Sequence, residues 1–369
     1  MAKIALVESK PSRNDYVRLF NNEIQFDQFQ LCSDPTVKKV LKRDCDIVIN
    51  EDDYDWIILV GSECLKYFTN QNSVTEYSGR CIDDKYLPVI NPAMLAFKPE
   101  AKKTWEESQS NIIKYTQGKL KQQKLGEDKC YGITDSPTLY TFLENALNHD
   151  NDFIALDSET SGLYPRDGYM LGISLSYEEE HGAYIDCECI DEKAEGLLQQ
   201  LFDKKRVVFH NAKFDLAFFE YHFGFKFPRF EDTMLLHYML DENPGTHGLK
   251  QLSLKYTPYG DYEKGMYEWM DDYCRRNGIL KGSFTWDLIP FDIMKDYAAM
   301  DAVCTFLLFQ KFENALVKND RLYGVYKDIL LPACRFLTDI QDIGVPFDKE
   351  RLQTSSVLMQ TQIDEAIEK

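Results

Sequence analysis

The stretch Phe153 to Thr160, FIALDSET, decides the fold, because a short apolar run ends in two carboxylates, Asp157 and Glu159. Alternate side chains of a β-strand share one face, so these two acids project together from a strand whose apolar residues anchor it in a sheet. Two like charges side by side are tolerated when one is protonated or when a bound cation neutralises both. Mg²⁺ and Mn²⁺ prefer such oxygen ligands. Taken alone, the pattern equally fits a strand end that turns into a solvated loop.

The composition indicates a globular protein of about two domains or slightly more, since the chain has 369 residues. No run approaches the ~18 apolar residues that a membrane span needs. The first ten residues, MAKIALVESK, lack the apolar core and cleavage site of a signal peptide. The ten cysteines are scattered without a CxxC pair, which favours reduced structural thiols. We therefore expect a cytoplasmic protein with no membrane partner.

The net charge of −19 argues against a protein that simply coats nucleic acid. It does not exclude an enzyme that holds acids around metal ions and confines its basic contacts to a groove. A solvated face is the simpler interpretation of each basic run. The candidates for such a groove are Lys204, Lys205, Arg206 and Lys213, and separately Arg275, Arg276 and Lys281.

Residues 1–115 are predicted to form a small α/β domain, because apolar strands alternate with helical stretches. The predicted strands are Ile4–Val7, Trp56–Val60 and Leu87–Ile90, and the predicted helices are Ser62–Phe68 and Glu100–Tyr115. Residues 116–134 are polar, punctuated by glycine and rich in lysine, so they are predicted to be a linker.

The second domain is predicted to span residues 135–320 and to begin with a helix from Ser136 to about Leu147. Three successive strands predict an antiparallel meander, and a helix that crosses to a fourth strand predicts a mixed sheet. The remaining segment is mostly helical, which gives an α/β fold class. The predicted strands are Phe153–Leu156, Met170–Ser176, Ala183–Asp186 and Arg206–Phe209; the predicted helices are Glu195–Phe202, Phe214–Phe223, Thr233–Leu240, Leu249–Tyr256 and Phe291–Leu316.

Two further carboxylates and a phenol approach the first acid pair. Asp215 follows the strand that ends at Phe209, near a strand end where a ligand crevice can form. Tyr297 and Asp301 are four residues apart on a predicted helix and therefore share a face. His210 beside the site is expected to be packed and hydrogen-bonded rather than a base. Asp232 equally fits a cap for the helix that starts at Thr233.

DSET at 157–160, HNAKFD at 210–215 and YAAMD at 297–301 together resemble the three motifs of the Asp-Glu-Asp-Asp-Tyr exonuclease family. This ribonuclease H-like family includes the 3′→5′ proofreading exonuclease of family A DNA polymerases. The resemblance covers roughly residues 133–316, and the N-terminal extension is most similar to that of tailed-bacteriophage family A polymerases. It implies a phage protein of the host cytoplasm.

The resemblance implies a site with two divalent cations, Mg²⁺ or Mn²⁺. Two metals about 4 Å apart can activate the attacking hydroxide and stabilise the departing 3′-oxyanion. The implied metal ligands are Asp157, Glu159, Asp215 and Asp301, with Tyr297 orienting the attacking water. The implied contacts to the terminal nucleotide are Thr160 and Leu163, and those to the unpaired strand are Asn211 and Phe214. Simple packing is the alternative role for Thr160, Leu163 and Phe214.

Two flanking segments carry weaker resemblances. Residues 1–115 are similar in layout to the uracil-DNA glycosylase superfamily, but Asn91 stands where that superfamily has a histidine, which implies a fold without glycosylase chemistry. Residues 329–353 resemble the passage from the exonuclease into the thumb of family A polymerases, so residues 321–369 are expected to be the start of a thumb-like helical region. No later region supplies palm carboxylates or fingers, so we expect no polymerase activity in this chain. The polymerase portion is expected in cis in a longer protein or in trans as a separate chain.

The sequence thus predicts a metal-dependent 3′→5′ DNA exonuclease that acts on single-stranded DNA 3′ ends or a mispaired primer terminus. Two alternatives stay open at this point. One is a ribonuclease D-like RNA 3′ exonuclease, which shares these motifs. The other is a non-catalytic module that binds strands or bridges to a partner.

Overall fold

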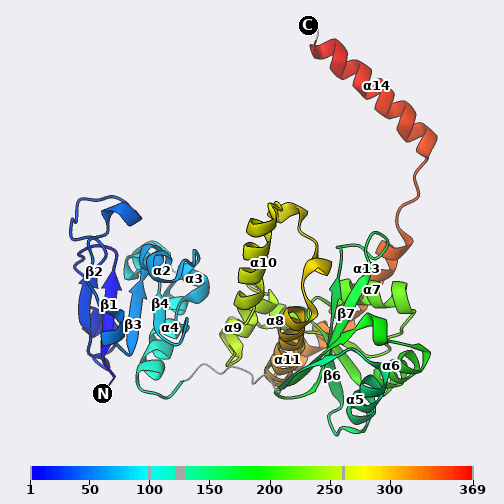
Figure 1. Cartoon of the computed structure of the whole chain (residues 1–369), viewed down its shortest axis with the longest axis horizontal. Coiled ribbons are helices and arrows are strands. Elements are labelled where there is room, and N and C mark those ends of the chain that lie inside the picture. The colour runs from blue at the N-terminus through cyan, green and yellow to red at the C-terminus, as the bar shows by residue number, and fades with distance from the viewer. Residues whose placement is uncertain (1, 99–100, 121–128, 260–261, 368–369) are drawn as a thin grey trace.

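The computed structural model describes residues 2–98, 101–120, 129–259 and 262–367 of the chain. Its strands form two sheets (Figure 1), one with the order β2-β1-β3-β4 and one with the order β10-β9-β6-β7-β8-β5. Within these residues, no helix is both long and apolar enough to cross a membrane.

The elements follow the chain in this order. The strands are β1 (Ile4–Glu8), β2 (Asp27–Gln30), β3 (Trp56–Val60), β4 (Tyr86–Val89), β5 (Cys130–Ile133), β6 (Phe153–Thr160), β7 (Met170–Glu178), β8 (His181–Asp186), β9 (Arg206–Phe209) and β10 (Phe230–Asp232). The α-helices are α1 (Tyr16–Leu19), α2 (Gly61–Thr69), α3 (Val74–Tyr77), α4 (Ala101–Thr116), α5 (Ser136–Asn148), α6 (Glu192–Lys204), α7 (Ala212–Phe223), α8 (Thr233–Leu240), α9 (Leu249–Tyr256), α10 (Lys264–Asn277), α11 (Phe291–Leu316), α12 (Asp320–Val325), α13 (Leu331–Ile343) and α14 (Lys349–Ile367).

The N-terminal sheet is parallel throughout. Its central strands β1 and β3 read as continuous apolar runs because both faces of the sheet are covered, and apolar side chains from the two faces enter two separate core clusters. The predicted strands at Trp56–Val60 and near Ile4 are confirmed. Strand β2 was not predicted, because it is short and its sequence, DQFQ, is mostly polar.

The second sheet is mixed, as predicted. Strands β6, β7 and β8 form the antiparallel meander, and β9 joins β6 in parallel after the crossover helix α6. The predicted linker 116–134 is wrong at its C-terminal end, because β5 pairs in parallel with β8. Only Cys130 and Ile133 of this edge strand are buried, so its apolar pattern is too short to indicate a strand. Helix α10 and strand β10 were also missed.

Helix α11 packs on β5, β6, β7 and β8 and carries buried residues over most of its length. Its apolar surface extends around the helix because the helix lies between the sheet and helices α8 and α9. The ring of Phe306 stacks on Phe153 at 4.5 Å between centroids, and Phe309 meets the same ring edge-on at 4.8 Å. These contacts fix the helix against β6, the strand that carries the acid pair.

We expect Gly182→Ala to destabilise the protein, because α11 approaches β8 too closely for a side chain there. A Cβ at Gly182 would lie 2.3 Å from the carbonyl oxygen of Ala299, which is a backbone atom of α11. Overpacking of this kind costs about 1–3 kcal/mol of unfolding free energy. Urea unfolding measures the loss.

Gly196→Ala is the matched control for this prediction. Gly196 lies inside helix α6, and a Cβ there would meet no atom within 4 Å. Alanine at a helix interior is favoured over glycine by about 0.5–1 kcal/mol, so this variant should be slightly more stable than the wild type. Equal stability of the two variants would contradict the close approach of α11 to β8.

Candidate active site

The acid pair lies within strand β6 rather than beyond its end, and the strand extends to Thr160. Asp157 is opposite Ser174 and Glu159 is opposite Gly172 on the neighbouring strand β7. A side chain at Gly172 would collide with the ring of Tyr184, since its Cβ would lie 2.3 Å from Cε2. The bare backbone therefore leaves room for an aromatic ring beside the carboxylates.

The structure brings three of the predicted carboxylates together. Asp157, Glu159 and Asp301 each offer one oxygen, and these oxygens all lie within 4.8 Å of one another. Glu159 and Asp301 are 6% and 4% exposed, so water cannot neutralise the charges by itself. Buried Glu159 Oε1 has no hydrogen-bond partner among the described residues. A buried, unpartnered carboxylate oxygen inside an acidic cluster fits a divalent cation.

Asp215 is not a member of this three-oxygen set, and its carboxylate is held by Ser158 of β6. Its Oδ1 accepts hydrogen bonds from the backbone nitrogen of Ser158, at 3.0 Å, and from the Ser158 hydroxyl, at 2.7 Å. Ser158 points away from its neighbours Asp157 and Glu159 because side chains alternate along a strand. Asp215 is still close enough for its charge to raise the pKa of Asp157.

The cluster cannot hold all its negative charges without a cation. Burial raises the pKa of Asp157, Glu159 and Asp301 well above the usual range of carboxyl groups, and their mutual repulsion raises it further. Burial also raises the pKa of Asp215 to about 7. A bound cation would favour the ionised forms, so metal binding at this site releases protons.

The stability of the metal-free protein should fall as the pH rises from about 4 to 7. Asp215 is protonated in the folded state below its pKa of about 7, whereas in the unfolded chain its pKa is the ordinary 3.8. Between these values the folded state binds more protons, so raising the pH favours unfolding. Melting temperatures measured in excess chelator should fall over this range, and less steeply in Asp215→Asn. A pH slope that is the same in both proteins would contradict the raised pKa.

Two tyrosines flank Asp301. Tyr297 lies one helical turn before it on α11, and Tyr262 donates a hydrogen bond to Asp301 Oδ1. The ring of Tyr297 lies 6.5 Å from that of Tyr262 and 5.9 Å from that of Trp286. Burial raises the pKa of both phenols, and the charge of Asp301 raises it further, so both stay protonated donors at neutral pH. Tyr262 was not predicted to belong to the site, because it lies in no motif and precedes helix α10, which was also not predicted.

Asp232 caps α8, as the sequence allowed, and it also holds the start of α7. Its carboxylate accepts hydrogen bonds from the backbone nitrogens of Met234 and Leu235 in α8. It also accepts from the nitrogens of Asn211 and Ala212, where α7 begins. Asp232 therefore fixes the helix that carries Asp215, without reaching the carboxylate cluster itself.

His210 is packed and hydrogen-bonded. Its Nδ1 lies 2.8 Å from the hydroxyl of Thr233, and burial lowers its pKa to about 3. A histidine that binds a proton so weakly is poorly suited to general-base catalysis near neutral pH.

The residues implied to contact substrate differ in exposure and in local contacts. The Thr160 hydroxyl donates to the carbonyl oxygen of Gly162, and Leu163 is 76% exposed in the loop between β6 and β7. Asn211 is exposed and adopts a left-handed backbone conformation, with φ 68°. Phe214 packs partly against the core, with its ring 4.9 Å from that of Phe218. Packing therefore accounts for part of the Phe214 side chain, but it does not account for the exposed side chain of Leu163.

The basic runs suggested as a groove are largely committed to other contacts within the domain. Lys204 and Lys205 donate to backbone carbonyl oxygens around residues 147–151. Arg206 pairs with Asp152, Glu231 and Glu313. The second basic run also forms ion pairs within the domain. Arg275 and Arg276 pair with Asp272, and Lys281 pairs with Asp271.

The chain is similar in sequence to known DNA polymerases. Residues 130–317 match a family model described as the 3′-5′ exonuclease of the DNA polymerase A group. The chain is 38% identical to the DNA polymerase of Escherichia phage T5, in an alignment that covers 100% of this chain and 45% of that protein. It is 24% identical to the DNA polymerase of Bacillus phage SP01, covering 84% of this chain and 37% of that protein. A solved structure, the POL domain of Pol1 from M. smegmatis with DNA primer-template and dNTP, has a TM-score of 0.45 and 17% identity, covering 64% of this chain and 36% of that one. The chain therefore spans less than half the length of these polymerases.

Proposed function

The chain belongs to the 3′-5′ exonuclease family of DNA polymerase A proteins, and from this premise we propose that it removes nucleotides from the 3′ end of single-stranded or mispaired DNA. One observation carries the proposal: Asp157, Glu159 and Asp301 gather three oxygens within 4.8 Å in a buried site. In a non-catalytic strand-binding module, burying carboxylates that repel one another would cost free energy without contributing to strand binding.

We propose two divalent cations, Mg²⁺ or Mn²⁺, at this site. Asp157, Glu159 and Asp301 would hold one, and Asp157 with Asp215 would hold the other, because the charge of Asp215 acts on Asp157. When bound, such a pair of ions activates the attacking hydroxide and stabilises the departing 3′-oxygen. The chain itself supplies the fixed carboxylate positions, through β6, α7 and α11.

The two tyrosines have different proposed roles. Tyr297 lies one helical turn before Asp301 on α11 and so shares its face, and its hydroxyl would position the nucleophilic water. Tyr262 would orient the Asp301 carboxylate through its hydrogen bond, because a ligating carboxylate is itself usually held by a hydrogen-bond donor.

The exposed side chains near the site would hold the DNA. Leu163 and Thr160 would contact the terminal nucleotide, while Asn211 and Phe214 would contact the unpaired strand, with the Phe214 ring offering a stacking surface. DNA is favoured over RNA because the relatives similar over most of this chain are DNA polymerases. We infer that the polymerase portion acts with this domain, in cis or as a separate chain.

We propose a division of the chain close to that predicted from the sequence. Residues 1–115 would form the N-terminal α/β domain, and the exonuclease domain would begin at β5 rather than at residue 135 and continue to about 320. Residues 321–369 would form a thumb-like helical region.

The function is tested with oligonucleotides labelled at the 5′ end. In Mg²⁺, the purified chain should shorten single-stranded DNA stepwise from its 3′ end, should act much less on RNA of the same sequence, and should stop in excess chelator. Faster degradation of RNA would favour the ribonuclease D-like alternative. The absence of any degradation in Mg²⁺ or Mn²⁺ would contradict the proposal.

A further inference from the structure

A cavity of about 740 Å³ opens in the N-terminal domain, at the carboxyl end of strand β3. Helix α2 starts directly after β3, and its residues Ser62 and Glu63 line the cavity together with the loop that carries Lys39 and Lys42. The volume lies within the range of about 300–1,000 Å³ that is usual for ligand sites. In open α/β sheets, the crevice at the carboxyl ends of the strands is where ligands bind.

Three lysines give this cavity its chemical character. Lys39, Lys42 and Lys66 line it and are exposed. As far as the described residues go, none of their ammonium groups forms a hydrogen bond or an ion pair. The acids that also line the cavity are Glu63 and Asp83, and Asp83 pairs with Lys264 at 2.7 Å. Free cations gathered in one cavity of a chain with net charge −19 favour an anionic ligand.

An aromatic ring stands beside the lysines. Tyr67 lines the cavity and is 40% exposed. Its ring meets Phe68 edge-on, with centroids 5.1 Å apart, and Phe68 in turn packs against the core and lies 5.9 Å from Tyr86. Tyr67 is therefore a braced, accessible ring. Lysines for phosphates and an aromatic face for bases are the combination by which proteins hold single strands without sequence preference.

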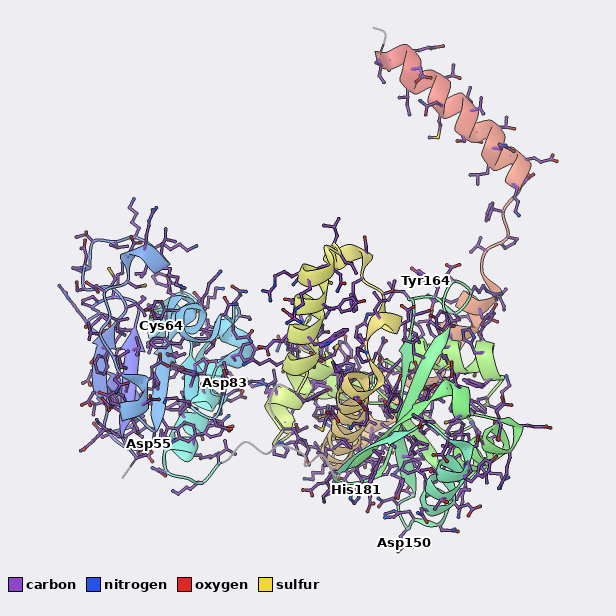
Figure 2. All side chains as sticks on the ribbon, viewed as in Figure 1. Asp55, Cys64, Asp83, Asp150, Tyr164 and His181 are labelled. Carbon is purple, nitrogen blue, oxygen red and sulfur yellow. The ribbon has the colours of Figure 1, made fainter. Side chains whose placement is uncertain are left out.

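The strand that leads to the cavity and the strand that carries the acid pair have the same direction (Figure 2). In Figure 2, Asp55 before β3 and Asp150 before β6 lie at the lower side, whereas Cys64 after β3 and Tyr164 after β6 lie at the upper side. Strands β3 and β6 thus run in the same sense. The two parts of the chain are also joined directly, by the Asp83–Lys264 ion pair and by a hydrogen bond of 3.4 Å from Arg80 to the carbonyl oxygen of Gln251.

We propose that this cavity binds single-stranded DNA, on the segment that precedes the 3′ end held at the carboxylate cluster. Lys39, Lys42 and Lys66 contact phosphates, and Tyr67 stacks on a base. The inference rests on the proposed exonuclease function for the direction of the strand, but the binding itself needs no turnover. A distant hold on the strand would keep the substrate near the site between successive cleavage steps.

The binding test uses a fluorescent oligothymidine of about 20 nucleotides in excess chelator, where no hydrolysis occurs. The triple variant Lys39→Gln, Lys42→Gln, Lys66→Gln should bind about 10-fold or more weakly at low salt. The slope of log affinity against log salt should shrink by about 2, because each phosphate contact on a single strand contributes about 0.7. Tyr67→Leu should lower the affinity without changing the slope.

The matched control is a triple variant on another face of the same domain. Lys98, Lys114 and Lys119 are also exposed, and changing all three to glutamine alters the net charge equally. This control should keep the affinity and slope of the wild type. Equal losses in both triple variants, or an unchanged slope in the first, would overturn the proposal. Thermal unfolding establishes that all variants are folded.

A kinetic test separates this inference from the proposed function. In Mg²⁺, the Lys39, Lys42, Lys66 variant should show a KM raised about 10-fold for the long oligothymidine, with kcat unchanged. Its KM for an oligothymidine of about 4 nucleotides, which is expected to occupy the carboxylate cluster alone, should equal that of the wild type. An equal rise for both lengths would overturn the cavity as a second contact. If the wild type did not cleave DNA at all, the exonuclease function would be contradicted. The binding experiment in chelator would still test whether the cavity binds DNA.

Discussion

Asp157→Ala is expected to abolish exonuclease activity, with a loss of at least about 10³-fold in kcat at saturating Mg²⁺. The reason is that Asp157 belongs to the three-carboxylate cluster with Glu159 and Asp301 and also interacts with the charge of Asp215, so both proposed cations depend on it. The measurement is single-turnover cleavage of single-stranded DNA over a titration of Mg²⁺ and of Mn²⁺. Activity in Asp157→Ala that is comparable to the wild type would rule out the metal mechanism at this cluster.

The same variant should be folded, and this separates lost chemistry from lost structure. Repulsion and burial raise the pKa of Asp157 well above its ordinary range, so the ionised side chain destabilises the metal-free protein at neutral pH. Removing it should therefore leave the melting temperature in chelator unchanged or raise it. In the wild type, added Mg²⁺ should raise the melting temperature by mass action, and in Asp157→Ala this increase should be much smaller.

Asp150→Ala is the matched control. Asp150 is an exposed acid that lies before β6, at the opposite end of that strand from Tyr164 (Figure 2), and its removal changes the net charge by the same amount. Its activity and its response to Mg²⁺ should match the wild type. A large loss of activity in this variant would mean that general electrostatics, rather than the cluster, governs turnover.

The parts of the fold that the sequence predicted are those with long apolar patterns. Strand β6, the meander that follows it and helix α11 bury many side chains in register, so their periodicity is strong. Strands β5 and β10 lie at the two edges of the sheet and bury few residues, so local pattern carries little information about them. Helix α10 buries only Met266 and Cys274, which explains why its apolar stripe was not recognised.

Some residues of the candidate site could likewise be predicted from the sequence, and others could not. The four carboxylates and Tyr297 are recognisable because each lies in one of the three motifs, at 157–160, 210–215 and 297–301. Tyr262 is not, because its role depends on a tertiary contact with Asp301 that no spacing in the sequence encodes. The charge of a lysine is visible in the sequence, but whether it is paired is not. Lys204 and Lys205 were candidates for a nucleic-acid groove, yet they donate hydrogen bonds to backbone carbonyl oxygens. Lys39 and Lys66, by contrast, line one cavity only in the folded domain.

Tyr297→Phe is expected to lower kcat about 10²-fold at saturating metal while leaving the affinities for metal and DNA nearly intact. The substitution removes one hydroxyl and keeps the ring, which packs between Tyr262 and Trp286. If that hydroxyl positions the attacking water, its loss acts on the transition state alone. Single-turnover cleavage and DNA binding in chelator, both at fixed salt, separate the two effects. An unchanged rate would remove Tyr297 from the mechanism.

Tyr262→Phe is the informative comparison, because it removes a neighbouring hydroxyl with a different task. Tyr262 holds Asp301 through a direct hydrogen bond, so its loss should loosen a metal ligand and raise the Mg²⁺ concentration needed for half-maximal activity by about 10-fold or more. At saturating Mg²⁺ its kcat should recover toward the wild-type value, whereas that of Tyr297→Phe should not. Mn²⁺ binding followed by electron paramagnetic resonance gives the metal affinity without turnover. If both variants lost activity equally at every metal concentration, the two tyrosines would share one structural role, and neither would be assigned to the water.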